Sequence, residues 1–272
     1  MRSAMNVGRL RIDPVVDGTA RFPPTASFRG TTEAQWKVHS DLLDADGLLG
    51  FAIGAFLIRG TGRTVLVDAG LGPGTILGIR CGALLDNLRS LGVAPEDVTD
   101  VVFTHLHMDH IGWAASAGSG VFTNAVHRCS IRDWEHFVTF GRGPQAEHLG
   151  PVLPRFQTWE ADAPLIPGLD TLAAPGHTPG STVLVVSSGS ERAVLLGDVV
   201  HCPVELLEVE WDGLADVDPE LAKRTRDRLA RELEGQAVPV AAAHFDGLHF
   251  GRLVRAEGRR RWAPLGAAGA GG

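Results

Sequence analysis

The stretch from Thr104 to Gly112, THLHMDHIG, is the feature that most constrains what this chain can fold into. An apolar run over residues 101–103 leads directly into it and predicts a short buried strand. Alternate side chains of an extended chain point to the same face, so the first two histidines can face one cation. A turn after them would let the remaining two ligands face a second cation. The four candidate ligands are His105, His107, Asp109 and His110.

Imidazole and carboxylate groups are ligands that borderline metals such as Zn²⁺ accept. The plain alternative is a solvated loop whose histidines form ordinary hydrogen bonds. Imidazoles crowded together after a buried strand would lose hydration. Without a metal they would gain no partner in exchange, which favours the metal interpretation. Four side chains cannot complete two metal coordination spheres. The metal interpretation therefore requires further ligands from elsewhere in the chain.

Three more candidate ligands lie where apolar strands are expected to begin or end. His177 is held between Pro-Gly corners in PGHTPG, Asp198 follows the run AVLLG, and His244 follows VPVAAA. Strand ends gather at one edge of a layered α/β fold, so we expect these side chains to meet the first four. A loop histidine with a local hydrogen bond is the alternative for His177. Asp68, after a fourth apolar run, is either an acceptor that orients a metal-binding histidine or a turn aspartate.

The seven candidates divide into two groups and one shared residue. The open coordination positions that remain are typical of catalytic metal sites rather than structural ones. The predicted division is His105, His107 and His177 on one metal, Asp109, His110 and His244 on the other, and Asp198 between them.

Apolar runs alternate with helical patterns along the chain, which predicts an α/β layered fold. Residues 1–46 are expected to form an edge strand and a loop, and residues 141–168 an irregular surface connection. Helices are predicted over 80–91, 133–140 and from the N-cap Asp218 to about 234. Strands are predicted over 51–58, 64–67, 101–103, 121–130, 182–186, 193–196 and 238–243.

The bulk properties narrow the class of protein. A chain of 272 residues with 44% hydrophobic residues can form one large domain, predicted over 1–265, followed by a Gly/Ala-rich tail, 266–272, predicted to be disordered. The net charge of −7 argues against a nucleic-acid partner. No apolar run is long enough to span a bilayer. Three widely spaced cysteines, Cys81, Cys129 and Cys202, indicate free thiols and a reducing, cytoplasmic compartment. The protein is expected to be a monomer or a homodimer.

The segments HLHMDHIGW, PGHTPGST, LLGDVVH and AAHF together resemble the metallo-β-lactamase-fold hydrolases, over residues of about 50 to 262. The resemblance implies a four-layer αβ/βα sandwich in a single domain. It also implies a site for two divalent metal ions at one edge, with zinc expected and manganese, iron or cobalt as alternatives. Asp109 and Asp198 match the positions that build the second metal site and the bridge. Asp68 matches the acidic position that supports the site.

Within that superfamily the chain is similar to the acyl-homoserine lactone lactonases and to methyl parathion hydrolase. It departs from the lactonases at two positions. His201 stands three residues after the bridging aspartate, where tyrosine is frequent, and the chain contains no tyrosine. Ser181 stands where many lactonases have histidine. Both departures leave the seven ligands in place and concern the substrate.

The predicted function is a dinuclear-metal hydrolase in which a metal-bridging hydroxide cleaves a lactone or a carboxylic ester. Asp109 is the candidate acceptor of a hydrogen bond from the nucleophile, and His201 is the candidate donor to the leaving alkoxide, with a structural hydrogen bond as its alternative role. Alternatives are a thioesterase, a phosphotriesterase, or a non-catalytic ligand-binding or sensor protein. The pocket is expected to take a small molecule. Its wall is expected to include Trp113, with Phe28, Trp36, Phe156 and Trp159 as further candidates.

Overall fold

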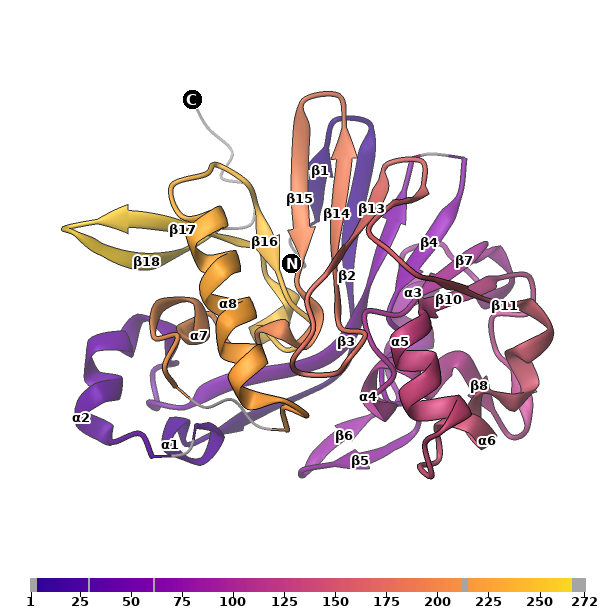
Figure 1. Cartoon of the computed structure of the whole chain (residues 1–272), viewed down its shortest axis with the longest axis horizontal. Coiled ribbons are helices and arrows are strands. Elements are labelled where there is room, and N and C mark those ends of the chain that lie inside the picture. The colour runs from indigo at the N-terminus through magenta and orange to yellow at the C-terminus, as the bar shows by residue number, and fades with distance from the viewer. Residues whose placement is uncertain (1–3, 29, 61, 212–214, 266–272) are drawn as a thin grey trace.

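Two seven-stranded sheets stack face to face in the computed structural model, which describes residues 4–28, 30–60, 62–211 and 215–265 (Figure 1). The first sheet has the order β1-β2-β3-β4-β7-β10-β11 and the second β12-β13-β14-β15-β16-β17-β18. The strands of the first sheet are β1 (Met5–Val7), β2 (Leu10–Phe22), β3 (Leu49–Arg59), β4 (Thr64–Val67), β7 (Asp100–Val102), β10 (Val126–Ser130) and β11 (Phe156–Trp159). Those of the second are β12 (Pro164–Ile166), β13 (Leu169–Ala173), β14 (Thr182–Ser188), β15 (Glu191–Leu195), β16 (Val240–Ala241), β17 (Gly251–Ala256) and β18 (Arg259–Pro264).

Helices and two small hairpins complete the described fold. The hairpins are β5 (Gly74–Ile76) with β6 (Ile79–Cys81), and β8 (Ala115–Ser116) with β9 (Ser119–Gly120). The α-helices are α1 (Pro24–Ser27), α2 (Glu33–Trp36), α3 (Leu84–Ser90), α4 (Met108–Ile111), α5 (Ile131–Trp134), α6 (Gln145–Leu149), α7 (Val204–Leu207) and α8 (Pro219–Leu233). Short 3₁₀ and π turns are η1 (Lys37–Leu42), η2 (Pro95–Asp97), η3 (Gly112–Ala114), η4 (Glu135–Thr139), η5 (Gly150–Arg155), η6 (Gly197–Val199) and η7 (Asp246–Leu248). No helix of the described residues is long and apolar enough to cross a membrane.

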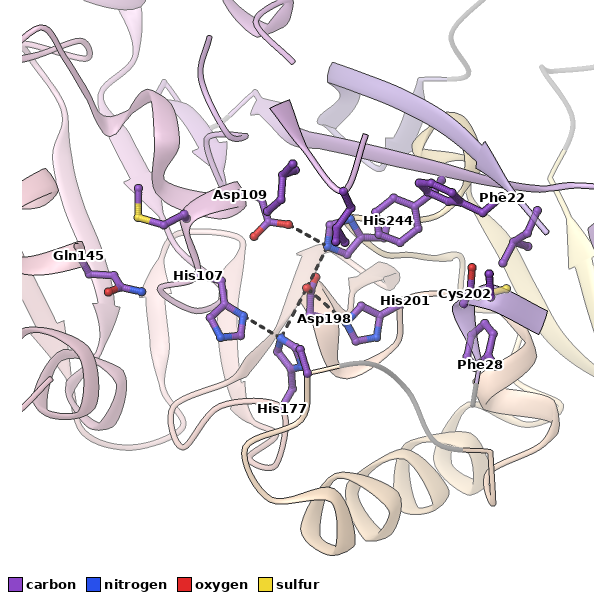
Figure 2. Close-up of a pocket in the computed structure, with 18 residues that line it drawn as sticks. Phe22, Phe28, His107, Asp109, Gln145, His177, Asp198, His201, Cys202 and His244 are labelled. Carbon is purple, nitrogen blue, oxygen red and sulfur yellow. Dashed lines mark hydrogen bonds and ion pairs between the residues drawn. The ribbon is translucent and has the colours of Figure 1, made fainter. Parts of the chain in front are cut away.

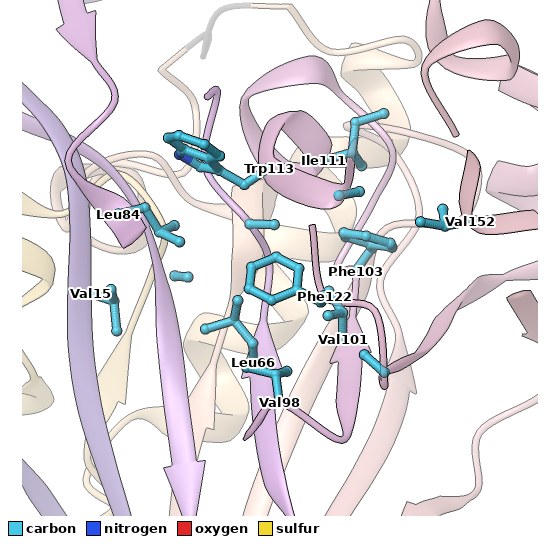
Figure 3. Close-up of a cluster of buried hydrophobic side chains, with 14 of the residues drawn as sticks. Val15, Leu66, Leu84, Val98, Val101, Phe103, Ile111, Trp113, Phe122 and Val152 are labelled. Atoms are coloured by element: carbon cyan, nitrogen blue, oxygen red, sulfur yellow. The ribbon is translucent and has the colours of Figure 1, made fainter. Parts of the chain in front are cut away.

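Both sheets bury both faces, and the period of two along each strand produces the layers. In β4, Val65 and Val67 pack between the sheets while Leu66 packs outward against the α3 layer. In β15, Leu195 packs between the sheets while Val194 packs outward with residues of α8. The outer core of the first sheet surrounds Leu66 and its neighbours (Figure 3). The result is the predicted αβ/βα sandwich.

Parallel pairing explains why the polar ends of several strands meet. In the first sheet, β4 pairs in parallel with β7, and β7 with β10, so the segments that follow these strands leave from the same edge. In the second sheet, β15 and β16 are parallel, and β14 runs antiparallel to β15. The segment before β14 therefore lies at the same edge as the segments after β15 and β16. These segments carry all seven predicted ligands.

Three local predictions differ from the structure. The helix predicted over 80–91 begins only at Leu84, because the buried carboxylate of Asp17 accepts hydrogen bonds from the backbone N–H groups of Gly82 and Leu84 and holds this turn outside the helix. Gly82 has φ +130°, a conformation that side chains disfavour. The strand predicted over 121–130 begins at Val126, and that over 238–243 contracts to β16.

The segment 141–168, predicted to be irregular, contains α6, η5, β11 and β12. Its strand β11 extends the first sheet by pairing in parallel with β10, and the Phe156 ring stacks on Phe103. Residues 1–46 likewise contain more than an edge strand and a loop, since β2 pairs along most of β3 and is followed by α1, α2 and η1. The predicted disordered tail, 266–272, lies outside the described residues.

His127 in β10 provides a test of this core. Its ring packs beside both Phe103 and Phe156, with centroids 6.1 Å and 6.3 Å away, and neither ring nitrogen has a hydrogen-bond partner among the described residues. Burial lowers the pKa of His127 to about 4. The histidine of the unfolded chain binds its proton near pH 6.5, so its contribution to stability is fully present above that pH. As the pH drops from there toward 4, the contribution falls by about 1.4 kcal/mol for each step of one in pH.

We therefore expect His127→Leu to lose less unfolding free energy than the wild type between pH 7 and pH 4.5, by about 1–3 kcal/mol. Urea unfolding of both metal-loaded proteins at several pH values measures the difference. His249→Leu, at an exposed position, should keep the wild-type pH dependence. A His127→Leu curve parallel to the wild-type curve would assign the acid sensitivity to other groups.

Candidate metal centre

Asp68 organises the loop that carries the first four ligands. It follows β4 with φ +60°, a left-handed conformation that aspartate tolerates better than most residues. Its carboxylate accepts hydrogen bonds from the backbone N–H and the hydroxyl of Thr104, at 2.8 Å and 2.9 Å. The other contact is with His110 Nδ1, at 3.0 Å. Asp68 therefore orients one of the candidate ligands, as predicted, and leaves His110 Nε2 facing the site.

The first predicted group comes together around His107. Its Nδ1 lies 3.0 Å from His105 Nε2 and 3.0 Å from His177 Nε2. The back of His177 is held by Asp216, whose Oδ1 lies 3.1 Å from His177 Nδ1. The ligand atoms of the three histidines all lie within 4.8 Å of one another, a spacing that fits a single metal ion.

The second predicted group consists of Asp109, His110 and His244, whose ligand atoms also lie within 4.8 Å of one another. His244 Nδ1 donates to the carbonyl oxygen of Ala52 at 2.8 Å, which points His244 Nε2 toward Asp109 Oδ2 at 3.6 Å. The ring of Phe51 stacks on His244 with centroids 4.3 Å apart. A backbone acceptor and an aromatic face thus fix the orientation of this ligand.

Asp198, in η6, lies between the two groups (Figure 2). One carboxylate oxygen is 3.2 Å from His110 Nε2. The other is 2.9 Å from His244 Nε2, and 3.7 Å and 3.6 Å from the Nε2 atoms of His105 and His177. The structure therefore brings all seven predicted side chains together, with Asp198 in the bridging position. Both metal assignments stay predictions until ions are measured.

The chemistry of this donor set fits divalent cations. Burial lowers the pKa of His105 well below its usual value and that of His107 to about 4, so both rings are neutral at pH 7. His105 Nε2 and His107 Nδ1 lie 3.0 Å apart, so at most one hydrogen can lie between them. At least one of the two nitrogens therefore has a lone pair that can bind a cation. The Oδ1 atom of Asp198 and the Nε2 atom of His110 are buried and face each other at 3.2 Å without the geometry of a hydrogen bond. Cations that accept nitrogen and oxygen ligands would satisfy these atoms.

His201 adds an imidazole that belongs to neither group. Its Nε2 lies 3.5 Å from Asp198 Oδ2, and its Nδ1 lies 3.5 Å from Glu205 Oε2. Burial lowers the pKa of His201, but the charges of Glu205 and Asp198 outweigh burial and raise it to about 9. The side chain is 14% exposed and lines the cavity, so this imidazole, whose raised pKa favours the protonated form, faces the cavity.

A cavity of about 560 Å³ opens over the ligands, and its other walls are apolar (Figure 2). Phe28 lines it, as predicted. The prediction for Trp113 was wrong, because its ring packs in the core and its Nε1 donates to Asp17 at 2.9 Å. Trp36, Phe156 and Trp159 also lie outside the lining. The wall residues that were not predicted from the sequence are Phe22, Leu49, Phe51, Ile76 and Met108.

A second buried aspartate, Asp133, was also missed, and it ties two ligand loops together. Its Oδ2 accepts from Leu106 N at 2.9 Å, and its Oδ1 accepts from Gly180 N at 2.6 Å. Leu106 lies between two histidines of the first group, and Gly180 follows the loop of the third. A sequence signal existed, since Asp133 lies only three residues after the predicted strand 121–130. Its place at the start of a predicted helix suggested a solvent-facing residue instead.

Replacing Asp133 by asparagine tests this tie. The amide can accept only one of the two backbone N–H groups and turns its NH₂ toward the other, so we expect a loss of about 1–3 kcal/mol in the free energy of unfolding. Urea unfolding in the presence of chelator measures the loss without a metal contribution. Asp41→Asn, at an exposed aspartate, should change stability by less than about 0.5 kcal/mol. Equal values for the two variants would rule out the tie.

Comparison with known proteins places this geometry in context. A family model described as the metallo-beta-lactamase superfamily matches residues 50–244. "Metallo-beta-lactamase domain-containing protein 1" of Xenopus laevis is 31% identical over 224 residues, 81% of each chain. The N-acyl homoserine lactonase AiiA of Bacillus thuringiensis subsp. kurstaki is 29% identical over 160 residues, 58% of this chain. The chain matches only 59% of the length of that lactonase.

A solved structure extends the likeness to nearly the whole fold. The structure of AidC, described as a dizinc quorum-quenching lactonase, superposes with a TM-score of 0.82 over 97% of both chains at 24% identity. At this identity the superposition shows the shared fold alone. The match covers both sheets, which together carry the seven side chains described above.

Proposed function

The chain belongs to the metallo-beta-lactamase superfamily of metal-dependent hydrolases, and we propose that it opens a lactone or cleaves a carboxylic ester at a dinuclear site. The observation that carries this proposal is the position of Asp198, within 3.7 Å of histidine nitrogens from both three-ligand groups. A carboxylate so placed can bridge two ions and leave each with an open position, which suits catalysis. We assign residues 1–265 to this one domain.

The proposed ligands are His105, His107 and His177 for one ion, Asp109, His110 and His244 for the other, and Asp198 for both. When bound, two divalent ions, zinc being expected, lower the pKa of a shared water molecule toward neutrality and polarise the carbonyl group of the substrate. Asp109, with its side chain 18% exposed at the cavity, can accept the proton of the nucleophile. His201 can donate a proton to the leaving alkoxide.

The cavity favours a neutral substrate with an apolar acyl or aryl group. Its volume of about 560 Å³ suits a small molecule. No lysine or arginine occurs among the described residues that line it, so a glutathione thioester or an anionic phosphate would find no counter-charge there beyond the ions and His201. Ser181, which replaces a frequent lactonase histidine, accepts from Thr178 N within its own loop and does not line the cavity. The names of the lactonase relatives favour a lactone as the substrate. The apolar wall of the cavity suits an ester equally well.

Metal analysis tests the dinuclear proposal directly. We expect two zinc ions per chain after reconstitution, and loss of hydrolysis when chelator removes them. Asp198→Ala should retain at most one ion and lower kcat by about 10³-fold or more, since both ions lose a shared ligand. The substrates are an acyl lactone, an aryl ester, a thioester and a phosphotriester.

His249→Ala, at an exposed histidine, is the matched control and should keep both ions and full activity. Fewer than two ions per wild-type chain would contradict the dinuclear site. Two bound ions without turnover of any of the four substrate classes would instead favour a non-catalytic binding protein.

The role of His201 predicts a dependence on the leaving group. His201→Gln should lower kcat on alkyl esters, which have basic leaving groups, by about 10²-fold, because general acid catalysis contributes that much. Nitrophenyl esters, whose leaving group needs no proton, should be hydrolysed at nearly the wild-type rate. Steady-state kinetics on a series of esters provides the comparison. A uniform loss across the series would leave His201 with a structural role.

A further inference from the structure

Helix α8 carries a guanidinium into the protein directly behind the proposed site. Arg226 is 1% exposed, and its Nη1 lies 3.1 Å from Asp216 Oδ2 and 3.9 Å from Glu205 Oε1. The side chains of the two carboxylates are 3% and 0% exposed. A buried cluster of one cation and two anions is costly to desolvate and is weak evidence for stability alone. Its contacts on the other side indicate another purpose.

Each carboxylate holds one imidazole of the site from the side opposite the cavity. Asp216 uses one oxygen for Arg226 and the other for Nδ1 of His177, at 3.1 Å. Glu205 accepts from the backbone N–H groups of His201 and Cys202, at 2.5 Å and 3.2 Å, and lies 3.5 Å from Nδ1 of His201. At His177 the acceptor at Nδ1 places the hydrogen there and leaves Nε2 directed into the site, whereas Glu205 stands near His201 Nδ1 as a counter-charge without a hydrogen bond to it.

A second ion cluster of the protein lacks this connection to the proposed site. Asp100 forms another buried cluster with Arg63 and Arg128, at the start of β7, away from the edge that carries the ligands. That cluster joins strands and contacts none of the proposed site residues. The cluster of Arg226 differs because both of its carboxylates continue to a histidine at the cavity.

We infer that Arg226 is a positioning residue that fixes both His177, a proposed metal ligand, and His201, the proposed proton donor, through Asp216 and Glu205. The inference rests on the proposed function. Arg226 supplies the counter-charge that lets two nearly inaccessible carboxylates stay within reach of each other and of their imidazoles. Nη1 of Arg226 makes both contacts, while its Nε and Nη2 have no hydrogen-bond partner among the described residues, so the guanidinium acts here chiefly through its charge.

Three variants separate this role from ordinary packing. Arg226→Met keeps the length and removes the charge, and Arg226→Lys keeps the charge. Arg228→Met is the matched control, because Arg228 lies two residues along the same helix with its side chain 51% exposed. Competition with a chromophoric chelator measures the affinity of each apo protein for zinc, independently of any substrate. Steady-state kinetics on alkyl and nitrophenyl esters gives kcat and KM.

We expect Arg226→Met to weaken the binding of one of the two ions by about 10–100-fold, the usual loss when the partner behind a ligand is disturbed. Its kcat on alkyl esters should fall more than its kcat on nitrophenyl esters, with little change in KM. Arg226→Lys should recover part of both losses. Arg228→Met should match the wild type in zinc affinity.

Two further variants divide the effect and guard against misfolding of Arg226→Met. Asp216→Asn should weaken zinc binding, whereas Glu205→Gln should keep zinc affinity and lose activity chiefly on alkyl esters. If all folded variants bind both ions with wild-type affinity, the inference is overturned, whichever substrate the enzyme uses. If the wild type binds zinc but cleaves no ester or lactone, the proposed function fails, and the zinc affinities of Arg226→Met and Asp216→Asn still decide whether Arg226 positions His177.

Discussion

The rest of the site is arranged around one buried carboxylate, that of Asp198, which contacts both groups of candidate ligands. Asp198 is 4% exposed and lies within 3.7 Å of nitrogens from five histidines, the fifth being His201. Such an arrangement is unfavourable without cations, because burial opposes charge on the imidazoles and the carboxylate alike. Every other feature of the site serves to keep these groups in place. Asp68 and Asp216 hold two of the histidines from behind, and the backbone carbonyl of Ala52 holds a third.

The fold supplies this constraint by dividing the ligands between two sheets. The loop after β7 contributes His105, His107, Asp109 and His110, and the second sheet contributes His177, Asp198 and His244. Alternating apolar side chains fix the distance between the sheets, since one set of residues in each strand packs between them and the other packs outward. The site therefore depends on sheet packing as much as on the motif itself. Asp133, which contacts both ligand loops, joins the two halves close to the proposed metal ligands.

Sequence reasoning predicted that the seven candidate ligands would lie together because their signal is local. Each lies beside an apolar run, and strand ends of an α/β fold gather at one edge whatever the rest of the chain does. The cavity wall was predicted poorly for the opposite reason. Trp113 lies close to the ligand motif in the sequence, yet its Nε1 donates a hydrogen bond to the buried Asp17 and its ring packs in the core. The burial of Arg226 could not be predicted in this way, because a charged residue on a helix normally faces solvent. Its burial depends on two carboxylates, that of Glu205 in α7 and that of Asp216 just before α8.

The separation of the ligands along the chain affects the order in which the site can form during synthesis. His244 follows His105 by 139 positions (244 − 105). At translation rates of roughly 5–20 residues per second, about 7–28 s pass between their appearances. Through that interval the first histidines have only part of a coordination sphere, so an ion captured early is held weakly and exchanges freely. Firm loading must wait for the second sheet, which makes the choice of metal a property of the finished protein and of the ions then available to it.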